Sequence, residues 1–293
     1  MPHAIANGIR IEYETHGDPA NPPLLLIMGL GAQLTLWPIE LVEALVARGY
    51  YVIRHDNRDI GLSEKFGHAG VPNFRRVALM RLFGLRAKLP YRLTDMADDA
   101  AALLDALGID SAHIVGGSMG GMIAQLLAID HAPRVRTLTS IFSTTGNPRL
   151  PRPRPEAMNA LLDRAPANAT LDQVIPIGIR VARAIGSPAY PAPEEYLRER
   201  IARDYARSFY PEGPARQIAA IMDDGDRRKR LRRVTAPTLV IHGTDDPLVP
   251  VEGGRDTARA IPGARLHEIS GMGHDLPLEL VDEIAEAIAA HAR

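Results

Sequence analysis

Short apolar runs alternate with longer amphipathic segments along most of this chain. The short runs have the length of buried strands, and the amphipathic segments repeat their apolar residues with the period of a helix. Strands are predicted at residues 24–28, 51–54, 112–115, 135–142, 237–242 and 265–269, and helices at 38–47, 94–107, 119–129 and 277–290. Near the start, Asn7-Gly8 suits a type I′ turn and predicts a β-hairpin. The pattern indicates an α/β fold, with helices on both faces of a mostly parallel sheet.

The alternation stops between residues 143 and 233. This stretch begins with four closely spaced prolines and contains no convincing strand pattern. Helical patterns occur at residues 156–164, 171–185, 194–208 and 215–222. We interpret residues 143–233 as a helical cap inserted between two parts of one core, residues 1–142 and 234–293. Because specificity on such scaffolds is carried by loops and insertions, the cap is expected to roof the site and shape a substrate pocket.

A glycine-rich segment, Gly-Gly-Ser-Met-Gly-Gly at residues 116–121, joins a predicted strand to a predicted helix. Gly116 and Gly120 bracket Ser118 in the Gly-x-Ser-x-Gly pattern of a nucleophile elbow. Small neighbours permit the sharp turn, and the following helix directs its N-terminal N–H groups toward the serine. The structural alternative is a glycine-rich turn whose serine only caps the helix. A serine is a weak nucleophile alone, so the elbow requires a base and a carboxylate that orients it.

Both partners are expected at the ends of later strands. Of the ten histidines, only His274 lies in a glycine-bracketed loop between the last strand and the last helix. The loop after residues 237–242 offers two adjacent acids, Asp245 and Asp246, and the residues themselves leave the choice open. The resulting chain order of Ser, Asp and His is that of one class of serine hydrolases.

An oxyanion hole is the remaining requirement, because negative charge develops on the substrate carbonyl oxygen during acyl transfer. One donor is expected to be the N–H of Met119, directly after the serine, and the second comes from the loop after an earlier strand. Gly29-Leu30-Gly31 is that loop. Since methionine forms an adaptable apolar lining, we expect a pocket around the site. Its predicted lining is Met28, Gly29, Trp37 and Met272.

Together these motifs resemble the α/β-hydrolase superfamily. Its acid loop commonly reads His-Gly-x-x-Asp-x-x-Val-Pro, which on residues 242–250 selects Asp246 and implies the triad Ser118, Asp246 and His274. Its oxyanion loop commonly carries His-Gly followed by the donor, which implies Leu30. Met28 stands here where that histidine is usual.

Several segments are similar, more narrowly, to the aclacinomycin methylesterase-like group of this superfamily. They are residues 26–29, 37–38, 52–56, 58–63 and 271–274. Within residues 58–63, Asp59 occupies a position where the broader superfamily usually has glycine. We expect Asp56, Arg58 and Ser63 to form a structural network in this turn.

The resemblance implies an α/β-hydrolase fold and a serine hydrolase that cleaves carboxylic esters through an acyl-serine intermediate, with no cofactor and no metal. The expected substrate is a small-molecule ester with an apolar acyl or alcohol part. Lactonase, carbon–carbon bond hydrolase, perhydrolase and proline iminopeptidase activities remain alternatives with the same triad. Haloalkane dehalogenases and epoxide hydrolases use Asp at the elbow, where this chain has Ser118.

Two remote alternatives belong to other classes. Gly29-Leu30-Gly31 followed by Asp56 looks like the start of a dinucleotide-binding unit of an oxidoreductase. However, Leu34 takes the place of its third glycine, and the next predicted helix begins too late to face a pyrophosphate. The other alternative is a ligand-binding module whose triad is vestigial.

Composition adds limits on partners and location. The chain has no cysteine, which excludes thiolate catalysis and cysteine-ligated metals. It shows neither a signal-peptide pattern nor an apolar run of about 18 residues, so a cytoplasmic protein with no membrane partner is expected. A net charge of −1 argues against nucleic acid as a partner. The basic run at residues 227–233 is expected to be a solvated helix face, and the oligomeric state stays open.

Overall fold

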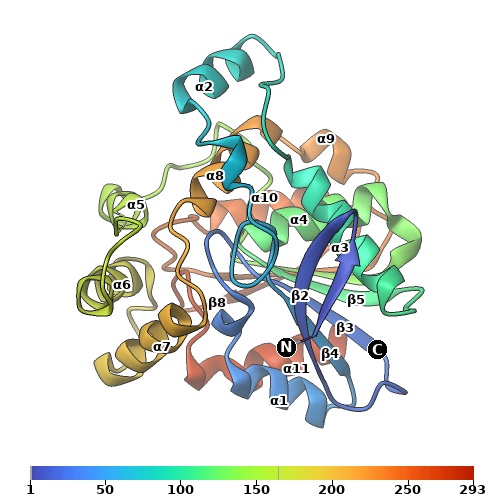
Figure 1. The fold of residues 1–293 in the computed structure, drawn as a ribbon. Coiled ribbons are helices and arrows are strands. Elements are labelled where there is room, and N and C mark those ends of the chain that lie inside the picture. Colours follow the sequence, from blue (N-terminus) through green and yellow to red (C-terminus); the bar gives the residue numbers. More distant parts are fainter. Residues whose placement is uncertain (1, 164) are drawn as a thin grey trace.

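The structure, a computed structural model, describes residues 2–163 and 165–293. Within them an eight-stranded sheet has the strand order β1-β2-β4-β3-β5-β6-β7-β8 (Figure 1). The β1–β2 and β2–β4 pairs are antiparallel, and all pairs from β4 to β8 are parallel. The strands are β1 His3–Ala6, β2 Ile9–His16, β3 Pro23–Ile27, β4 Tyr51–His55, β5 Ala112–Gly117, β6 Val135–Ile141, β7 Thr238–Gly243 and β8 Arg265–Ile269.

Helices cover both faces of this sheet. One face packs against α1 (Ile39–Ala47) and α11 (Val281–His291), which also contact each other. The other face packs against α3 (Leu93–Ala106), α4 (Met119–Asp130) and α10 (Glu252–Ala260). Burial of apolar side chains on both faces is the main force that holds these layers together. The predicted α/β fold with a mostly parallel sheet is therefore confirmed.

Local details agree with the sequence patterns at most positions. The hairpin between β1 and β2 turns at Asn7 and Gly8, which have φ values of 50° and 76°, as a type I′ turn requires. Two α-helices were not predicted. One is α10, between β7 and β8, and the other is α2 (Phe74–Leu82), which lies between β4 and α3 and buries only Val77. Because α2 buries so little, its sequence lacks the apolar periodicity from which a helix is predicted.

The insertion after β6 is helical in its described part. Its helices are α5 Pro155–Leu162, α6 Leu171–Ile185, α7 Glu194–Arg207, α8 Gly213–Asp224 and the short α9 Arg228–Leu231. α5, α6 and α7 lie side by side at one flank of the core, and α8 lies against α2 (Figure 1). The limits of the cap at residues 143 and 233 stay a prediction.

The basic run at residues 227–233 differs from its predicted role at one position. Arg227 is buried and donates to Gln125 Oε1 at 3.0 Å, to Asp224 Oδ2 at 2.6 Å and to the Thr144 carbonyl at 2.6 Å. A solvated face is therefore wrong for Arg227, which ties the end of the cap to core helix α4. Lys229, Arg232 and Arg233 are exposed, as predicted.

Candidate active site

Ser118 lies at the junction of β5 and α4 in a strained backbone conformation, with φ 56° and ψ −120°. Close packing at the neighbouring glycines explains how the turn is accommodated. A Cβ on Gly116 would lie 2.2 Å from the carbonyl oxygen of Gly120, and a Cβ on Gly120 would lie 1.9 Å from that of Ile27. Neither position has room for a side chain. The segment therefore has the geometry of a nucleophile elbow.

Three predicted residues from three separate loops meet at this elbow. Ser118 Oγ is 2.9 Å from His274 Nε2, and His274 Nδ1 is 2.7 Å from Asp246 Oδ2. An ionised carboxylate can only accept, so the proton of the neutral imidazole lies on Nδ1 and Nε2 is the acceptor for the serine hydroxyl. This is the arrangement in which a histidine can take a proton from a serine.

Asp246 is held in its ionised form by its neighbours. Its Oδ1 accepts from the N–H groups of Leu248 at 2.9 Å and Val249 at 2.8 Å. Burial alone raises the pKa of Asp246, but the charges and hydrogen bonds of His274 and His242 outweigh it and lower the pKa to about 2. The adjacent Asp245 is exposed and accepts from the Gly271 N–H at 3.1 Å. The geometry thus favours Asp246 over Asp245 as the partner of His274.

The loop after β3 lies against the serine. A Cβ on Gly29 would be 3.0 Å from Ser118 Cβ, so glycine permits this close approach. In the part of the chain that the structure describes, the amide N–H groups of Leu30 and Met119 donate to no protein acceptor. Both amides are therefore available to a ligand atom, as the two donors of an oxyanion hole must be.

This loop is anchored without the usual histidine. The Met28 carbonyl accepts from Asn57 Nδ2 at 2.8 Å, and the Gly31 N–H donates to Gln217 Oε1 at 2.9 Å. Gln217, on α8, also donates to the Arg58 carbonyl at 2.9 Å and is fully buried. Cap helix α8 therefore supplies the contact that fixes the loop.

Above the serine lies a large cavity of about 1090 Å³ between core and cap. Ser118, His274, Met28, Gly29 and Leu30 all line it, together with Met119. Every helix from α5 to α8 contributes to its roof, mainly with apolar side chains. Examples are Met158, Leu161, Val181, Ile185, Leu197, Ile201, Ile218 and Ile221.

Two residues predicted for the pocket do not line it. Trp37 and Met272 are fully buried in the apolar cluster beneath the loops, beside α1 and α11. The Trp37 ring is 3.6 Å from where a Cβ on Gly117 would lie, so it supports the elbow from below. The prediction of both as pocket residues is wrong, because they point into the core from the same loops whose other side faces the cavity.

The structure adds site residues for which the sequence gave no separate signal. The Phe142 ring lies 4.8 Å from the His274 ring, centroid to centroid, and lines the cavity. Ser187 Oγ accepts from the Gly273 N–H at 2.8 Å and donates to Asp275. The backbone N–H of His274 donates to the Ile185 carbonyl of α6 at 2.7 Å. The loop that carries His274 is therefore fixed by the cap as well as by the core.

The geometry disagrees with a dinucleotide site near Asp56. Its carboxylate is buried and accepts from the Leu34 N–H at 2.7 Å, the Leu62 N–H at 2.8 Å and Arg207 Nη1 at 2.7 Å. Ser63 Oγ donates to the Asp56 carbonyl at 2.6 Å. These contacts join Asp56 and Ser63 as expected for this turn and leave the carboxylate unavailable to a ribose. The Arg58 guanidinium pairs instead with Asp99 of α3. In residues 2–163 and 165–293, no group of three or more His, Asp and Glu side chains could hold a metal ion.

Sequence comparison with known proteins shows the family of this chain. A sequence model of the alpha/beta hydrolase fold matches residues 22–279. Rhodomycin D methylesterase DauP of Streptomyces sp. (strain C5) is 33% identical over 94% of this chain and 93% of its own length, and DnrP of Streptomyces peucetius is 34% identical over the same shares. These values confirm the resemblance to the aclacinomycin methylesterase-like group.

Solved structures agree at the level of the fold. The enol-lactonase from Burkholderia xenovorans LB400 superposes with a TM-score of 0.74 at 24% identity and covers 99% of both chains. The meta-cleavage product hydrolase CumD from Pseudomonas fluorescens IP01 gives a TM-score of 0.77 at 22% identity, over 99% of this chain and 97% of its own. The chain therefore belongs to the α/β-hydrolase family and is a hydrolase of its aclacinomycin methylesterase-like group.

Proposed function

We propose that this protein cleaves carboxylic esters of small molecules, with Ser118 as nucleophile, His274 as general base and Asp246 as the carboxylate that orients His274. The observation that carries the proposal is the Ser118–His274–Asp246 hydrogen-bond chain, with distances of 2.9 and 2.7 Å, on the floor of a large apolar cavity. Nothing beyond a triad, two amide donors and a pocket is needed for this reaction.

The mechanism follows from these positions. His274 Nε2 takes the proton of Ser118 as Oγ attacks the ester carbonyl, and Asp246 stabilises the imidazolium that forms. The amides of Leu30 and Met119 stabilise the oxyanion. His274 then returns the proton to the departing alkoxide, which leaves as the alcohol. A water activated by His274 attacks the acyl-serine and releases the acid.

The cavity supports a substrate with a bulky apolar part. Binding pockets for drug-sized ligands usually occupy about 300–1,000 Å³, and this one is about 1090 Å³. The relatives DauP and DnrP are named as methylesterases of rhodomycin D. Methyl esters of bulky apolar carboxylic acids are therefore our first substrate candidates. The proposed reaction involves no nucleic acid and takes place in the cytoplasm.

The test is an activity screen of wild type and Ser118→Ala. We expect hydrolysis of p-nitrophenyl butyrate and of a methyl ester of a polycyclic aromatic acid. Ser118→Ala should lower kcat by roughly 10⁴-fold or more, because triad residues act as a unit. A fluorophosphonate probe should label wild type at Ser118 and leave the variant unlabelled. Labelling at another serine, or ester turnover that survives in Ser118→Ala, would contradict the assignment.

Other reactions compatible with the triad are separated in the same screen. An aryl lactone, a vinylogous 1,5-diketone, a peracid assay and a proline arylamide report lactonase, carbon–carbon hydrolase, perhydrolase and iminopeptidase activities. Esters should give the highest kcat/KM of the set. Addition of EDTA, NAD or FAD should leave that value unchanged, whereas an oxidoreductase would respond to the nucleotide. Tight binding of an ester without turnover would instead favour a ligand-binding module.

A further inference from the structure

Helix α2 and its flanks form the most apolar exposed surface of the described chain. α2 stands at an outer corner of the molecule, away from cap helices α5, α6 and α7 (Figure 1). Of the eleven large apolar residues that are exposed, six lie between residues 71 and 85. They are Val71, Phe74, Leu79, Leu82, Phe83 and Leu85, and we call them the α2 patch. Leu82 is 80% exposed and Phe83 is 70% exposed, so neither side chain contributes to the core.

Two residues of the patch, Leu79 and Leu82, lie on the side of α2 that faces away from the protein. Val77 packs with Ala87 and with Ala219 of α8, and Met80 is partly buried beside them. At 100° per residue, Leu79 and Leu82 lie roughly opposite Val77 and Met80. α2 therefore docks on α8 through one narrow face and presents apolar side chains on the other.

The segment that carries the patch is rich in basic residues and contains no acidic residue of its own. Residues 65–94 contain no Asp or Glu but seven basic residues. These are Lys65, Arg75, Arg76, Arg81, Arg86, Lys88 and Arg92. The whole chain has a net charge of only −1, so positive charge is concentrated on this segment.

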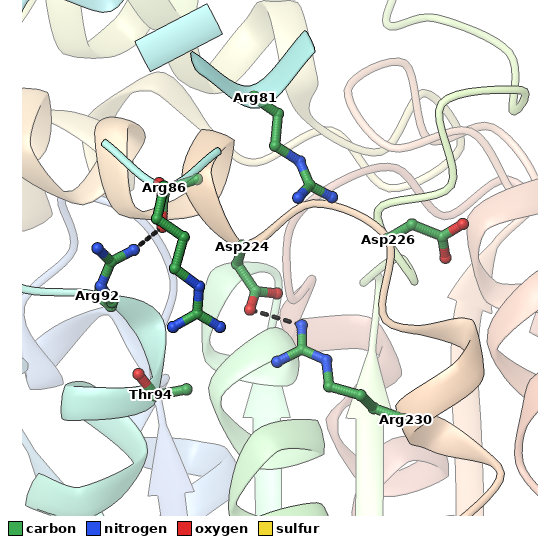
Figure 2. Close-up of a pocket in the computed structure, with 8 residues that line it drawn as sticks. Arg81, Arg86, Arg92, Thr94, Asp224, Asp226 and Arg230 are labelled. Atoms are coloured by element: carbon green, nitrogen blue, oxygen red, sulfur yellow. Dashed lines mark hydrogen bonds and ion pairs between the residues drawn. The ribbon is translucent and has the colours of Figure 1, made fainter. Parts of the chain in front are cut away.

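A crevice beneath α2 adds two arginines that lack a carboxylate partner. Arg81 and Arg86 extend into a cavity of about 220 Å³ that three aspartates also line (Figure 2). Each aspartate is already paired with an arginine: Asp223 with Arg92, Asp224 with Arg230, and Asp226 with Arg228. Among the described residues, Arg81 and Arg86 form no ion pair.

We propose that the α2 patch docks this protein on the surface of an anionic lipid bilayer. The apolar side chains of the patch enter the headgroup region, while Arg75 and Arg76, which are exposed on α2, pair with lipid phosphates. A helix that combines apolar side chains with arginines suits this interface. Basic residues strengthen the attachment where the membrane carries negative lipids. A second copy of the chain is a poorer occupant, because two such surfaces repel each other.

The docking is distinct from a membrane span. The described chain contains no helix that is long and apolar enough to cross a bilayer. The expectation of no membrane partner rests on the absence of a spanning run, a criterion that does not detect surface attachment. The patch also lies apart from the catalytic cavity, so its occupancy does not depend on the ester chemistry.

The first test is sedimentation of the full chain with vesicles. Wild type should bind vesicles of phosphatidylcholine with phosphatidylglycerol, and bind poorly to phosphatidylcholine alone or at high salt. Leu82→Asn with Phe83→Asn, and separately Arg75→Gln with Arg76→Gln, should each lower the partition coefficient by roughly tenfold or more. Arg149→Gln with Arg154→Gln removes two exposed arginines elsewhere and should leave binding unchanged. Circular dichroism checks that every variant remains folded.

The second test reports insertion directly and needs no loss of binding. The chain has a single tryptophan, Trp37, which is fully buried. Leu82→Trp places a second indole in the patch, and its emission should shift to the blue and be quenched by brominated lipids. Ile5→Trp, at a residue that is 68% exposed on β1, is the matched control and should show neither change.

Three results would overturn the proposal. Wild type that fails to bind the anionic vesicles refutes it, and so does equal binding by the Leu82→Asn, Phe83→Asn variant. A dimer in sedimentation velocity that this variant converts to monomer assigns the patch to a second copy of the chain instead.

Discussion

Ser118 shows how single positions create the site at a conformational cost. A non-glycine residue at positive φ is strained, and it persists only where the surrounding structure fixes it. Here the Ser118 N–H donates to the Ile141 carbonyl at 3.0 Å, and the Ser143 hydroxyl donates to the Ser118 carbonyl at 2.8 Å. The strained conformation directs Oγ toward His274 and the cavity. The Gly-x-Ser-x-Gly motif predicted this turn, because only small residues fit around it.

Gly120 gives a direct test of that packing. In Gly120→Ala the added methyl group would lie 1.9 Å from the Ile27 carbonyl oxygen, which belongs to a central strand and cannot move alone. We expect the free energy of unfolding to fall by roughly 3 kcal/mol or more. Urea unfolding measures it. Gly108→Ala is the control at an open glycine, where the positive φ of 69° is the only source of strain. An equal loss in both variants would show that packing at the elbow is not the cause.

The two adjacent aspartates give a second prediction at this scale. Asp246→Asn removes the charge that holds His274 in its catalytic tautomer, so kcat should fall roughly 10³–10⁴-fold. Asp245→Asn changes an exposed side chain and should lower kcat less than about tenfold. Both are measured on one ester at saturating concentration. A larger loss in Asp245→Asn would mean that the acid loop is read one residue out of register.

Element contacts explain what the sequence could and could not predict. The amphipathic period predicted α6 at its observed ends, Leu171 and Ile185. None of its residues is fully buried, but the apolar face that produces the period includes Val181 and Ile185, which line the cavity. Gln217 left no such record. Its partner Gly31 is 186 residues away, and one buried amide on α8 looks like any polar helix residue. The prediction that Trp37 and Met272 line the pocket was wrong for a similar reason. Proximity to a motif in the sequence does not indicate which side of a loop faces the cavity.

An ion pair between core and cap explains why Asp59 stands where the broader superfamily usually has glycine. This residue has a φ of 72°, a value that favours glycine and that aspartate tolerates better than most residues. Its carboxylate accepts from Arg216 Nε at 2.7 Å and Nη2 at 2.9 Å, and both side chains are fully buried. Tyr91 donates to the same carboxylate at 2.6 Å. The pair therefore couples the turn after β4 to cap helix α8.

Asp59→Gly tests this coupling against backbone strain. Glycine relieves the strain at positive φ, so a purely local view expects the variant to be more stable. We expect the opposite, a loss of roughly 3–5 kcal/mol, because Arg216 stays buried without its carboxylate. Urea unfolding of Asp59→Gly, Arg216→Met and the double variant forms the cycle. The double variant should lose less than the sum of the single changes, and additive losses would contradict coupling between core and cap.

At the scale of the whole molecule, buried histidines link folding to pH. His55 ends β4, is 1% exposed, and its Nδ1 has no hydrogen-bond partner among the described residues. Burial lowers the pKa of His55 from 6.5 to about 4, and the Asn57 side chain opposes this only in part. Burial likewise lowers the pKa of His113 to about 4, with further contributions from Arg136 and His291. Both imidazoles are therefore neutral in the folded protein where the unfolded chain binds protons.

The sign of the pH dependence follows from this difference. Between pH 6.5 and 4 His55 binds a proton in the unfolded chain but not in the folded one. The contribution of the neutral His55 to the free energy of unfolding is therefore complete above pH 6.5 and is lost as the pH falls toward 4. For His55 alone the loss reaches roughly 3 kcal/mol near pH 4. Urea unfolding at a series of pH values should show a flatter slope in His55→Gln than in wild type. The slope should not vanish, because His113 remains. His3→Gln, at an exposed residue, should keep the wild-type slope. A slope that is unchanged in His55→Gln would show that its imidazole becomes charged without unfolding the protein.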